Sequence, residues 1–281
     1  MAYISKYSGE DIDLRLDLIN KLTPRNLLDN SDFRNPVNQR GFISTNEDSL
    51  YTIDRWVTNS AYNAATVSLD SFGMTITKND ADYGGIYQNF ENYTAMYGKT
   101  YTAAICVNDI WDCVTFVMGN AAGGIMFPIS GILLFSVEWA QVLLRNYSDA
   151  PITIQRAALY EGSYTAETLP EYQPKGYGAE LAECKRYYRH DCLHGVSGYV
   201  LNGGQQFIGL IPDCEMRTTP TLTLTVMDNV VIEDAVVPIT GVSYVSRCGD
   251  GYQVVLTLAY QMAKFGVAVI AHAQGNLSAD L

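Results

Sequence analysis

The sequence predicts an all-β protein built from two antiparallel β-sandwiches, with a short helix ahead of them. Runs rich in Thr, Val, Ile and Tyr recur from residue 66 to residue 272, and Asn, Gly and Pro turn signals separate them at intervals of roughly eight to twelve residues. Many short strands with regular turns are typical of antiparallel sandwiches. The 20 tyrosines agree with this, because a flat ring with one polar tip suits half-buried strands.

Residues 8–22 predict a short amphipathic helix at the start of the chain. Ile12, Leu16 and Ile19 follow the four-three spacing of a coiled-coil seam. A helix of about fifteen residues is marginal alone in water, so it needs a partner. The partner is either its own domain or further copies in a small dimeric or trimeric bundle. We assign residues 1–25 to docking and oligomerisation.

The β pattern then divides the chain into two domains. Residues 26–177 form the first and larger β domain. Residues 178–189, GAELAECKRYYR, break the pattern and predict a linker in the form of a short helix or turn. Strand-like runs resume in residues 190–281, which predict a smaller C-terminal β-sandwich, the head domain. No repeat relates the two halves.

The charge of the chain limits the kinds of partner it can have. The formal net charge is −12 and the isoelectric point about 4.6, so the chain repels phosphate backbones and anionic membrane surfaces. We expect neither nucleic acid binding nor membrane insertion. The start of the chain is polar and acidic and has no signal-peptide pattern, which predicts a protein made in the cytoplasm without an export signal.

The six cysteines do not form a recognisable site. None belongs to a C-x-x-C pair, and their spacing is unlike that of a zinc site. The even count permits three disulfides, but nothing in the spacing requires them. We expect free thiols, as in a protein made in a reducing cytoplasm.

The sequence contains no catalytic motif, which predicts a non-enzymatic protein. Neither G-x-S-x-G nor a P-loop is present, and the Gly-Gly pairs that begin at residues 84, 123 and 203 are interpreted as turns or bulges. His190 and His194 have the spacing of a helical metal pair, but HDCLH lacks the Glu of a zincin, so we interpret them as a surface or interface pair. A carboxylate pair for glycoside hydrolysis stays open as an alternative.

Several segments, taken in order, resemble a known family. They are ISKYSGEDID at 4–13, NLLDNSDFRNPVNQRGF at 26–42, YTIDRWV at 51–57, IQRAALYEGSYTAETLPEYQPKGYGAELAECKRYY at 154–188 and EMRTTPTLTL at 215–224. Together they resemble phage or prophage tail fibre proteins, which are receptor-binding proteins with a carbohydrate-binding-module-like jelly roll. In the DRW element, we expect the Trp to fill a core while Asp54 and Arg55 pair at its edge.

The resemblance implies a jelly-roll first domain, a homotrimer and a place in the tail of a virion. Such a protein attaches to bacterial surface polysaccharide, has other tail or baseplate proteins as partners, and leaves its host by lysis. One alternative is a purely structural tail or baseplate subunit with no glycan binding. The other is a carbohydrate-active enzyme or its binding module.

Candidate sites follow from residue chemistry. Aromatic faces stack on pyranose rings and amides bond hydroxyls. Two stretches combine them, one with Tyr83, Tyr87 and Gln88 and the other with Tyr199, Asn202, Gln205 and Gln206. Strand surface or trimer contacts are the alternative role for both stretches.

Two further sets of residues concern assembly and metal binding. Arg186, Tyr187 and Tyr188 alternate cationic and aromatic side chains as subunit interfaces do, so we expect them to join the helix in oligomerisation. Asp29, Asp32 and Glu161 lie near the first and last strands of the first domain, where a structural calcium ion is one alternative and solvated carboxylates are the other. We expect no other cofactor.

Overall fold

The computed structural model describes residues 24–60, 65–136, 141–193, 195–200, 205–212, 215–226, 229–232, 235–259, 266–270 and 273–279. The predicted helix over 8–22, with Ile12, Leu16 and Ile19, lies outside these residues. The chain forms two compact units. Unit 1 comprises Met1–Asn35, Ile43–Leu50 and Val57–Pro174, and unit 2 comprises Pro36–Phe42, Tyr51–Trp56 and Lys175–Leu281.

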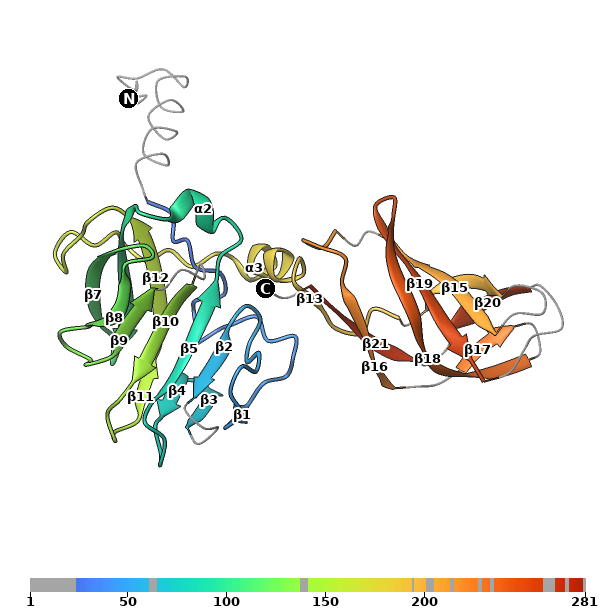
Figure 1. Cartoon of the computed structure of the whole chain (residues 1–281), viewed down its shortest axis with the longest axis horizontal. Helices are drawn as coiled ribbons and strands as arrows, with labels where there is room; N and C mark the ends of the chain where they lie inside the picture. Colours follow the sequence, from blue (N-terminus) through green and yellow to red (C-terminus); the bar gives the residue numbers. More distant parts are fainter. Residues whose placement is uncertain are drawn as a thin grey trace, which may run out of the picture. The chain divides into compact units, whose positions relative to one another are not determined.

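The prediction of an all-β protein is confirmed. Unit 1 contains a five-stranded antiparallel sheet with the order β2-β5-β10-β9-β8 (Figure 1). Its strands are β2 (Val57–Ser60), β5 (Gly84–Asn89), β8 (Ala121–Met126), β9 (Leu133–Ser136) and β10 (Gln141–Asn146).

Two smaller sheets complete unit 1. One has the order β1-β3-β4-β11 and the other the order β12-β6-β7. Their strands are β1 (Ser44–Thr45), β3 (Thr66–Asp70), β4 (Gly73–Thr77), β6 (Thr100–Val107), β7 (Ile110–Val117), β11 (Ile152–Ile154) and β12 (Arg156–Glu161). A single helical turn, α2 (Tyr93–Met96), precedes β6.

The core of unit 1 follows from strand alternation. Ile86, Leu134 and Leu144 occupy the inner face of the five-stranded sheet and are almost fully buried. A Cβ atom on Gly84 would lie 3.1 Å from Cγ2 of Ile76, so β5 packs closely on β4 at this point. The opposite face of the five-stranded sheet is therefore its outer face.

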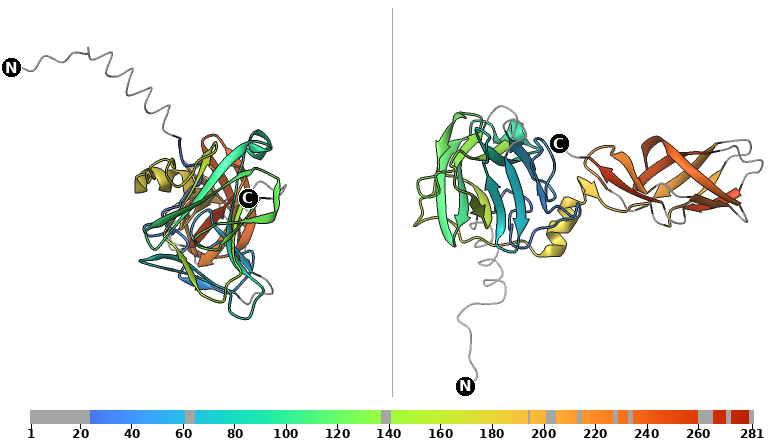
Figure 2. Two further views of the ribbon diagram at one scale, coloured as in Figure 1. Left: turned by 90° about the vertical axis from the view of Figure 1, so that its left-hand side faces the viewer. Right: turned by 90° about the horizontal axis from the view of Figure 1, so that it is seen from below.

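Unit 2 combines one helix, a small sheet and a barrel. The helix α3 (Tyr177–Cys184) precedes the sheet β13-β21-β16, and six further strands form a closed barrel with the order β14-β15-β19-β18-β17-β20 (Figure 2). The strands are β13 (Tyr188–Arg189), β14 (Ser197–Val200), β15 (Gln206–Ile211), β16 (Thr221–Val226), β17 (Asn229–Ile232), β18 (Ala235–Cys248), β19 (Gly251–Leu258), β20 (Gly266–Ile270) and β21 (Gln274–Ser278).

The barrel differs from the sandwich that the sequence predicted for the C-terminal part. Its longest strand, β18, has 14 residues and two register shifts against β19, one between Ile239 and Gly241 and one between Val242 and Tyr244. Bulges of this kind bend a strand, so β18 can pair with β17 at one end and with β19 along the rest. Closure then leaves the barrel without an exposed edge. Phe207 and Val254 fill its interior.

Two short segments from the early part of the chain belong to unit 2. They pack on the KRYYR stretch: the guanidinium carbon of Arg55 lies 3.6 Å from the ring centroid of Tyr187, and that of Arg40 lies 3.8 Å from the ring centroid of Tyr188. Trp56 is fully buried, as predicted for the DRW element. The expected pair of Asp54 and Arg55 is replaced by two other contacts. Arg55 stacks on the Tyr187 ring, and the carboxylate of Asp54 lies 3.5 Å from Nε of Arg40.

This packing concerns three residues that the sequence assigns to oligomerisation, Arg186, Tyr187 and Tyr188. Tyr187 and Tyr188 are 4% and 7% exposed within a single chain, so their rings are covered before any second subunit arrives. Arg186 stays exposed, with its guanidinium carbon 5.8 Å from the Tyr187 ring centroid. Burial within one chain leaves these two rings little surface for a subunit contact, and the oligomerisation role stays a prediction.

The described part of the chain shows two further features. Cys106, Cys113 and Cys248 are free thiols, as predicted, and Cys214 lies outside the described residues. None of the helices in the described ranges has the length and apolar character needed to span a membrane.

Candidate functional site

The outer face of the five-stranded sheet carries a group of aromatic rings around one arginine. We call this group the aromatic face; it consists of Asn59, Tyr83, Phe135, Arg145 and Tyr147. Arg145 of β10 lies opposite Gly85 of β5 and Leu133 of β9 in the strand register. Because its neighbour Leu144 points into the core, the side chain of Arg145 projects from the outer face.

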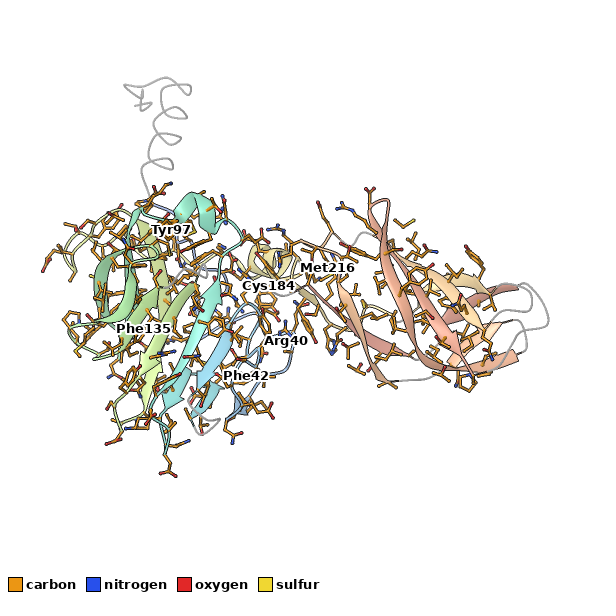
Figure 3. The ribbon with its side chains drawn as sticks, viewed as in Figure 1. Arg40, Phe42, Tyr97, Phe135, Cys184 and Met216 are labelled. Carbon is orange, nitrogen blue, oxygen red and sulfur yellow. The ribbon has the colours of Figure 1, made fainter. Side chains whose placement is uncertain are left out.

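Arg145 is held between two of these rings. Its guanidinium carbon lies 4.0 Å from the ring centroid of Tyr83 and 4.7 Å from that of Phe135. The Tyr147 ring lies beside both, with centroid distances of 5.4 Å to Tyr83 and 6.4 Å to Phe135. Contacts of this length are favourable cation–π and aromatic contacts. Phe135 is labelled in Figure 3.

Hydrogen bonds fix the orientation of the guanidinium group. Nε of Arg145 donates to Oδ1 of Asn59 at 2.7 Å, and Nη1 donates to the Tyr147 hydroxyl at 3.4 Å. Asn59 comes from β2 and Phe135 from β9, so strands on both sides of β10 position its cation. A side chain fixed in this way loses little further freedom when it binds a ligand.

Two glycines make room for the aromatic face. A Cβ atom on Gly85 would lie 2.5 Å from the Leu144 carbonyl oxygen and 3.1 Å from Cγ of Arg145. A Cβ atom on Gly124 would lie 2.8 Å from Cζ of Phe135, and Gly124 has a φ of +77°. Glycine inside a strand often marks such a close approach.

The sequence predicted that the Gly-Gly pairs form turns or bulges, and the structure agrees for one of the two described pairs. Gly84 and Gly85 begin strand β5, so the prediction of a turn there is wrong. Gly123 and Gly124 lie in β8 where its register with β9 shifts between Ala121 and Ile125, so the prediction of a bulge there is confirmed.

Only part of the first predicted sugar-binding stretch contributes to this face. Tyr83 belongs to it, and Tyr87 lies opposite Leu143 on the same side of the sheet. Burial, and then the charge of Asp48, raises the pKa of the Tyr87 hydroxyl. Gln88 is fully buried; its Oε1 accepts from the backbone N–H of Asp29 and its Nε2 donates to the Asp29 carbonyl, each at 2.8 Å. The Gln88 amide is therefore unavailable to a ligand.

The other four residues of the aromatic face, Asn59, Phe135, Arg145 and Tyr147, are not predicted from the sequence. Part of the signal was present, since Arg145 and Tyr147 are two residues apart and follow the apolar run of β10, which places them on one side of a strand. The pairing of β10 with β9, which brings Phe135 next to Arg145, has no local signal.

The second predicted stretch lies on the outside of the barrel. Tyr199 of β14 is 39% exposed and lies opposite Ile208 of β15. Gln206 is exposed on the same side of β15, two residues from Ile208. Gln205 is also exposed, and its carbonyl accepts from the Leu258 N–H at 2.8 Å. Asn202 lies outside the described residues.

Two of the three candidate calcium ligands, Asp32 and Glu161, each lie beside a different basic side chain. An oxygen of Asp32 lies 3.6 Å from Nε of Arg156, and one of Glu161 lies 3.3 Å from Nζ of Lys99. Within the described residues, Asp29, Asp32 and Glu161 do not bring ligand atoms together in one cluster. His190 belongs to no metal-binding cluster in the same ranges, and His194 lies outside them.

The chain was compared with models of protein families, with curated protein sequences and with solved structures, and none of the three comparisons gives a match.

Proposed function

We propose that the protein is a phage or prophage tail fibre, a receptor-binding protein that attaches to bacterial cell-surface glycan through the aromatic face. The observation that carries this proposal is the fixed position of Arg145 between the rings of Tyr83 and Phe135. An ordered cation among partly exposed aromatic rings on the outer face of a sheet is typical of a ligand-binding surface.

The chemistry of the face favours a sugar. The rings offer flat apolar surfaces for the C–H face of a pyranose, and the guanidinium and hydroxyl groups beside them can bond sugar hydroxyls. The acidic chain disfavours nucleic acid, which is the other common ligand of aromatic and cationic surfaces. We assign the jelly-roll form to unit 1 as part of the same proposal.

We propose a homotrimer, because three copies of such a surface raise the avidity of glycan binding. Single contacts with sugars are weak, but three linked copies raise the overall avidity without new contacts. An exposed apolar row on the barrel favours assembly: Val231 lies opposite Val236 of β18 and Val269 of β20, and the last two are 54% and 39% exposed. Other tail or baseplate proteins are the partners we propose within the virion.

Two measurements on the full chain test the proposal. Light scattering should give a mass near three times 31.0 kDa, and the protein should bind one or more polysaccharides on a panel of purified bacterial surface glycans. A trimer that binds no glycan on the panel would favour the purely structural tail subunit. A monomer that hydrolyses a glycan would favour the carbohydrate-active enzyme.

A further inference from the structure

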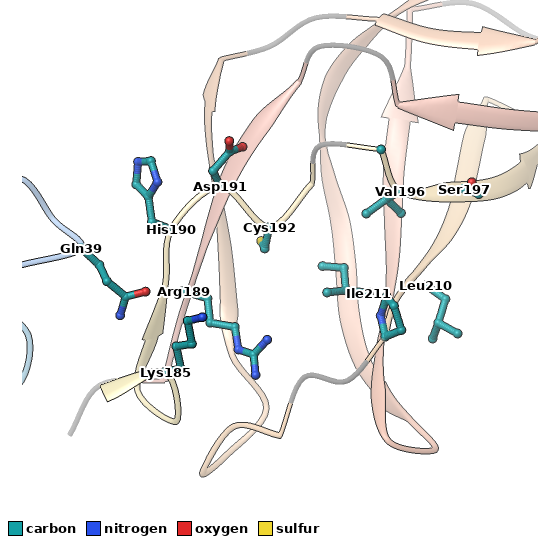
Figure 4. A pocket seen from close by; sticks show the side chains of 12 residues that line it. Gln39, Lys185, Arg189, His190, Asp191, Cys192, Val196, Ser197, Leu210 and Ile211 are labelled. Carbon is teal, nitrogen blue, oxygen red and sulfur yellow. The ribbon is translucent and has the colours of Figure 1, made fainter. Parts of the chain in front are cut away.

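Unit 2 contains a pocket with two chemically different walls. Its volume is about 610 Å³, within the range of small-molecule sites. Figure 4 shows Lys185 and Arg189 on one side of this pocket and Leu210 and Ile211 on the other. We call it the basic pocket. The aromatic face contributes nothing to it, since none of its residues lines the pocket.

The polar wall concentrates positive charge in an acidic protein. Lys185, Arg186 and Arg189 are three of the 18 lysines and arginines, yet they lie within five residues and no acid lies between them. Lys185 and Arg189 are both half-buried in the pocket wall. Partial burial lowers the screening of their charge by water, so an anion is attracted here in spite of the net charge of −12.

Asp191 adds a carboxylate to the wall of the same pocket. Its backbone N–H donates to Oδ1 of Asn276 at 3.0 Å, and its φ of +50° holds it in the left-handed region. Its Oδ1 atom is buried and has no hydrogen-bond donor among the residues that the structure describes. Because this oxygen has almost no exposed surface, it contributes to the polarity of the pocket wall and is not assigned a contact with a ligand.

The opposite wall is apolar. Val196 and Ile211 are 6% and 4% exposed and belong to the core of unit 2, so this wall is rigid. Leu210 extends the wall toward solvent and is 45% exposed. Such a surface suits the C–H face of a sugar ring and offers nothing to a small inorganic anion.

We propose that the basic pocket binds a carboxylate-bearing sugar residue of the hexuronic acid class. Lys185 and Arg189 receive the sugar carboxylate, and the exposed side chain of Leu210 contacts the C–H face. Binding of the free sugar acid depends on this pocket alone. That the sugar belongs to a bacterial surface glycan rests on the proposed function.

Titration of the full chain with three soluble probes, followed by NMR of the ligand signals, tests the proposal. D-glucuronate should bind saturably, and D-glucose and inorganic phosphate should each bind at least about tenfold more weakly, because each lacks one of the two recognised features. Phosphate bound as tightly as glucuronate would reduce the site to a simple anion site and overturn the proposal. Glucose bound as tightly, or no binding of glucuronate, would also overturn it.

A charge-matched pair of variants locates the binding. Lys185→Gln should weaken glucuronate binding about tenfold, because it removes a charge-assisted contact. Lys99→Gln changes the net charge equally but lies in unit 1, and it should leave the affinity unchanged. Equal affinities in both variants would place the sugar elsewhere. Loss of glucuronate binding in Lys185→Gln with retained binding to the glycan panel would separate this pocket from the aromatic face.

Discussion

The guanidinium carbon of Arg145 lies 4.0 Å from the ring centroid of Tyr83. The side chain is fixed from a second direction by the 2.7 Å hydrogen bond from its Nε atom to Oδ1 of Asn59. Aromatic contact and hydrogen bond together define one rotamer of a long side chain that is otherwise mobile on a sheet surface. The geometry of the aromatic face therefore depends on the planar guanidinium group of Arg145.

Arg145→Lys should weaken glycan binding while leaving the fold intact. Lysine keeps the charge but is a point charge without the planar fork, so it cannot stack between Tyr83 and Phe135 and bond Asn59 at the same time. We expect affinity for the bound polysaccharide to fall about tenfold, with unfolding free energy changed by less than about 1 kcal/mol. Arg34→Lys, at an exposed pair with Asp109, is the matched control and should bind normally.

Gly124→Ala should disturb the aromatic face from below. The new methyl group would lie 2.8 Å from Cζ of Phe135 and the residue would keep a φ of +77°, so we expect a loss of about 1–2 kcal/mol in the unfolding free energy. Gly123→Ala is the control, because a Cβ atom there has no neighbour within 4 Å. Denaturant melts of the two variants check this; equal stabilities would show that Phe135 does not need the space.

Arg55 should be more costly to replace by alanine than by glycine. Both changes remove the 3.6 Å contact with Tyr187, which we expect to stabilise unit 2 by about 2 kcal/mol because the side chain is 3% exposed. Glycine also relieves the φ of +77°, so Arg55→Gly should be the more stable variant by about 1 kcal/mol. Thermal unfolding ranks the two, and the reverse order would contradict the strained conformation.

Tyr160 should make the protein sensitive to alkali. Burial raises the pKa of its hydroxyl to about 12, above the value of 10.0 for an exposed tyrosine. The unfolded state therefore loses its proton first, so the stabilising effect is complete below pH 10 and is lost as the pH rises toward 12.

The matched variant isolates this effect from that of the other tyrosines. Between pH 10 and pH 12 the wild-type protein should lose about 2 kcal/mol more unfolding free energy than Tyr160→Phe. Chemical denaturation at fixed pH steps measures the difference. Parallel pH profiles for the two proteins would show that Tyr160 ionises freely in the folded state.

Local pattern predicted the strands better than their assembly. The run 100–107 coincides with β6 because a short apolar run with β-branched residues is a local signal. The barrel depends on β14 pairing with both β15 and β20, and β20 lies far along the chain, so no short window of sequence contains that information. The role of residues 36–42 and 51–56 in unit 2 was missed for the same reason.

The candidate site, like the fold, was predicted only in part. Tyr83 and Tyr87 were predicted from side-chain chemistry alone, since aromatic residues next to amides suit sugars. Gln88 was predicted to bind a sugar, but its side chain points into the core. Strand β5 begins with two glycines, so its sequence does not indicate which residues face inward. Predicting Arg145 as part of the site would have required knowing that β10 pairs with β9.

The most direct test compares the wild-type protein with the double variant Phe135→Ala, Arg145→Ala on a panel of purified bacterial surface polysaccharides. Gly123→Ala serves as the control, and circular dichroism verifies that all three proteins are folded. We expect saturable binding of the wild type and the control to the same polysaccharide and at least about a tenfold loss in the double variant. Equal binding by a folded double variant, or no binding by the wild type, would contradict attachment through the aromatic face.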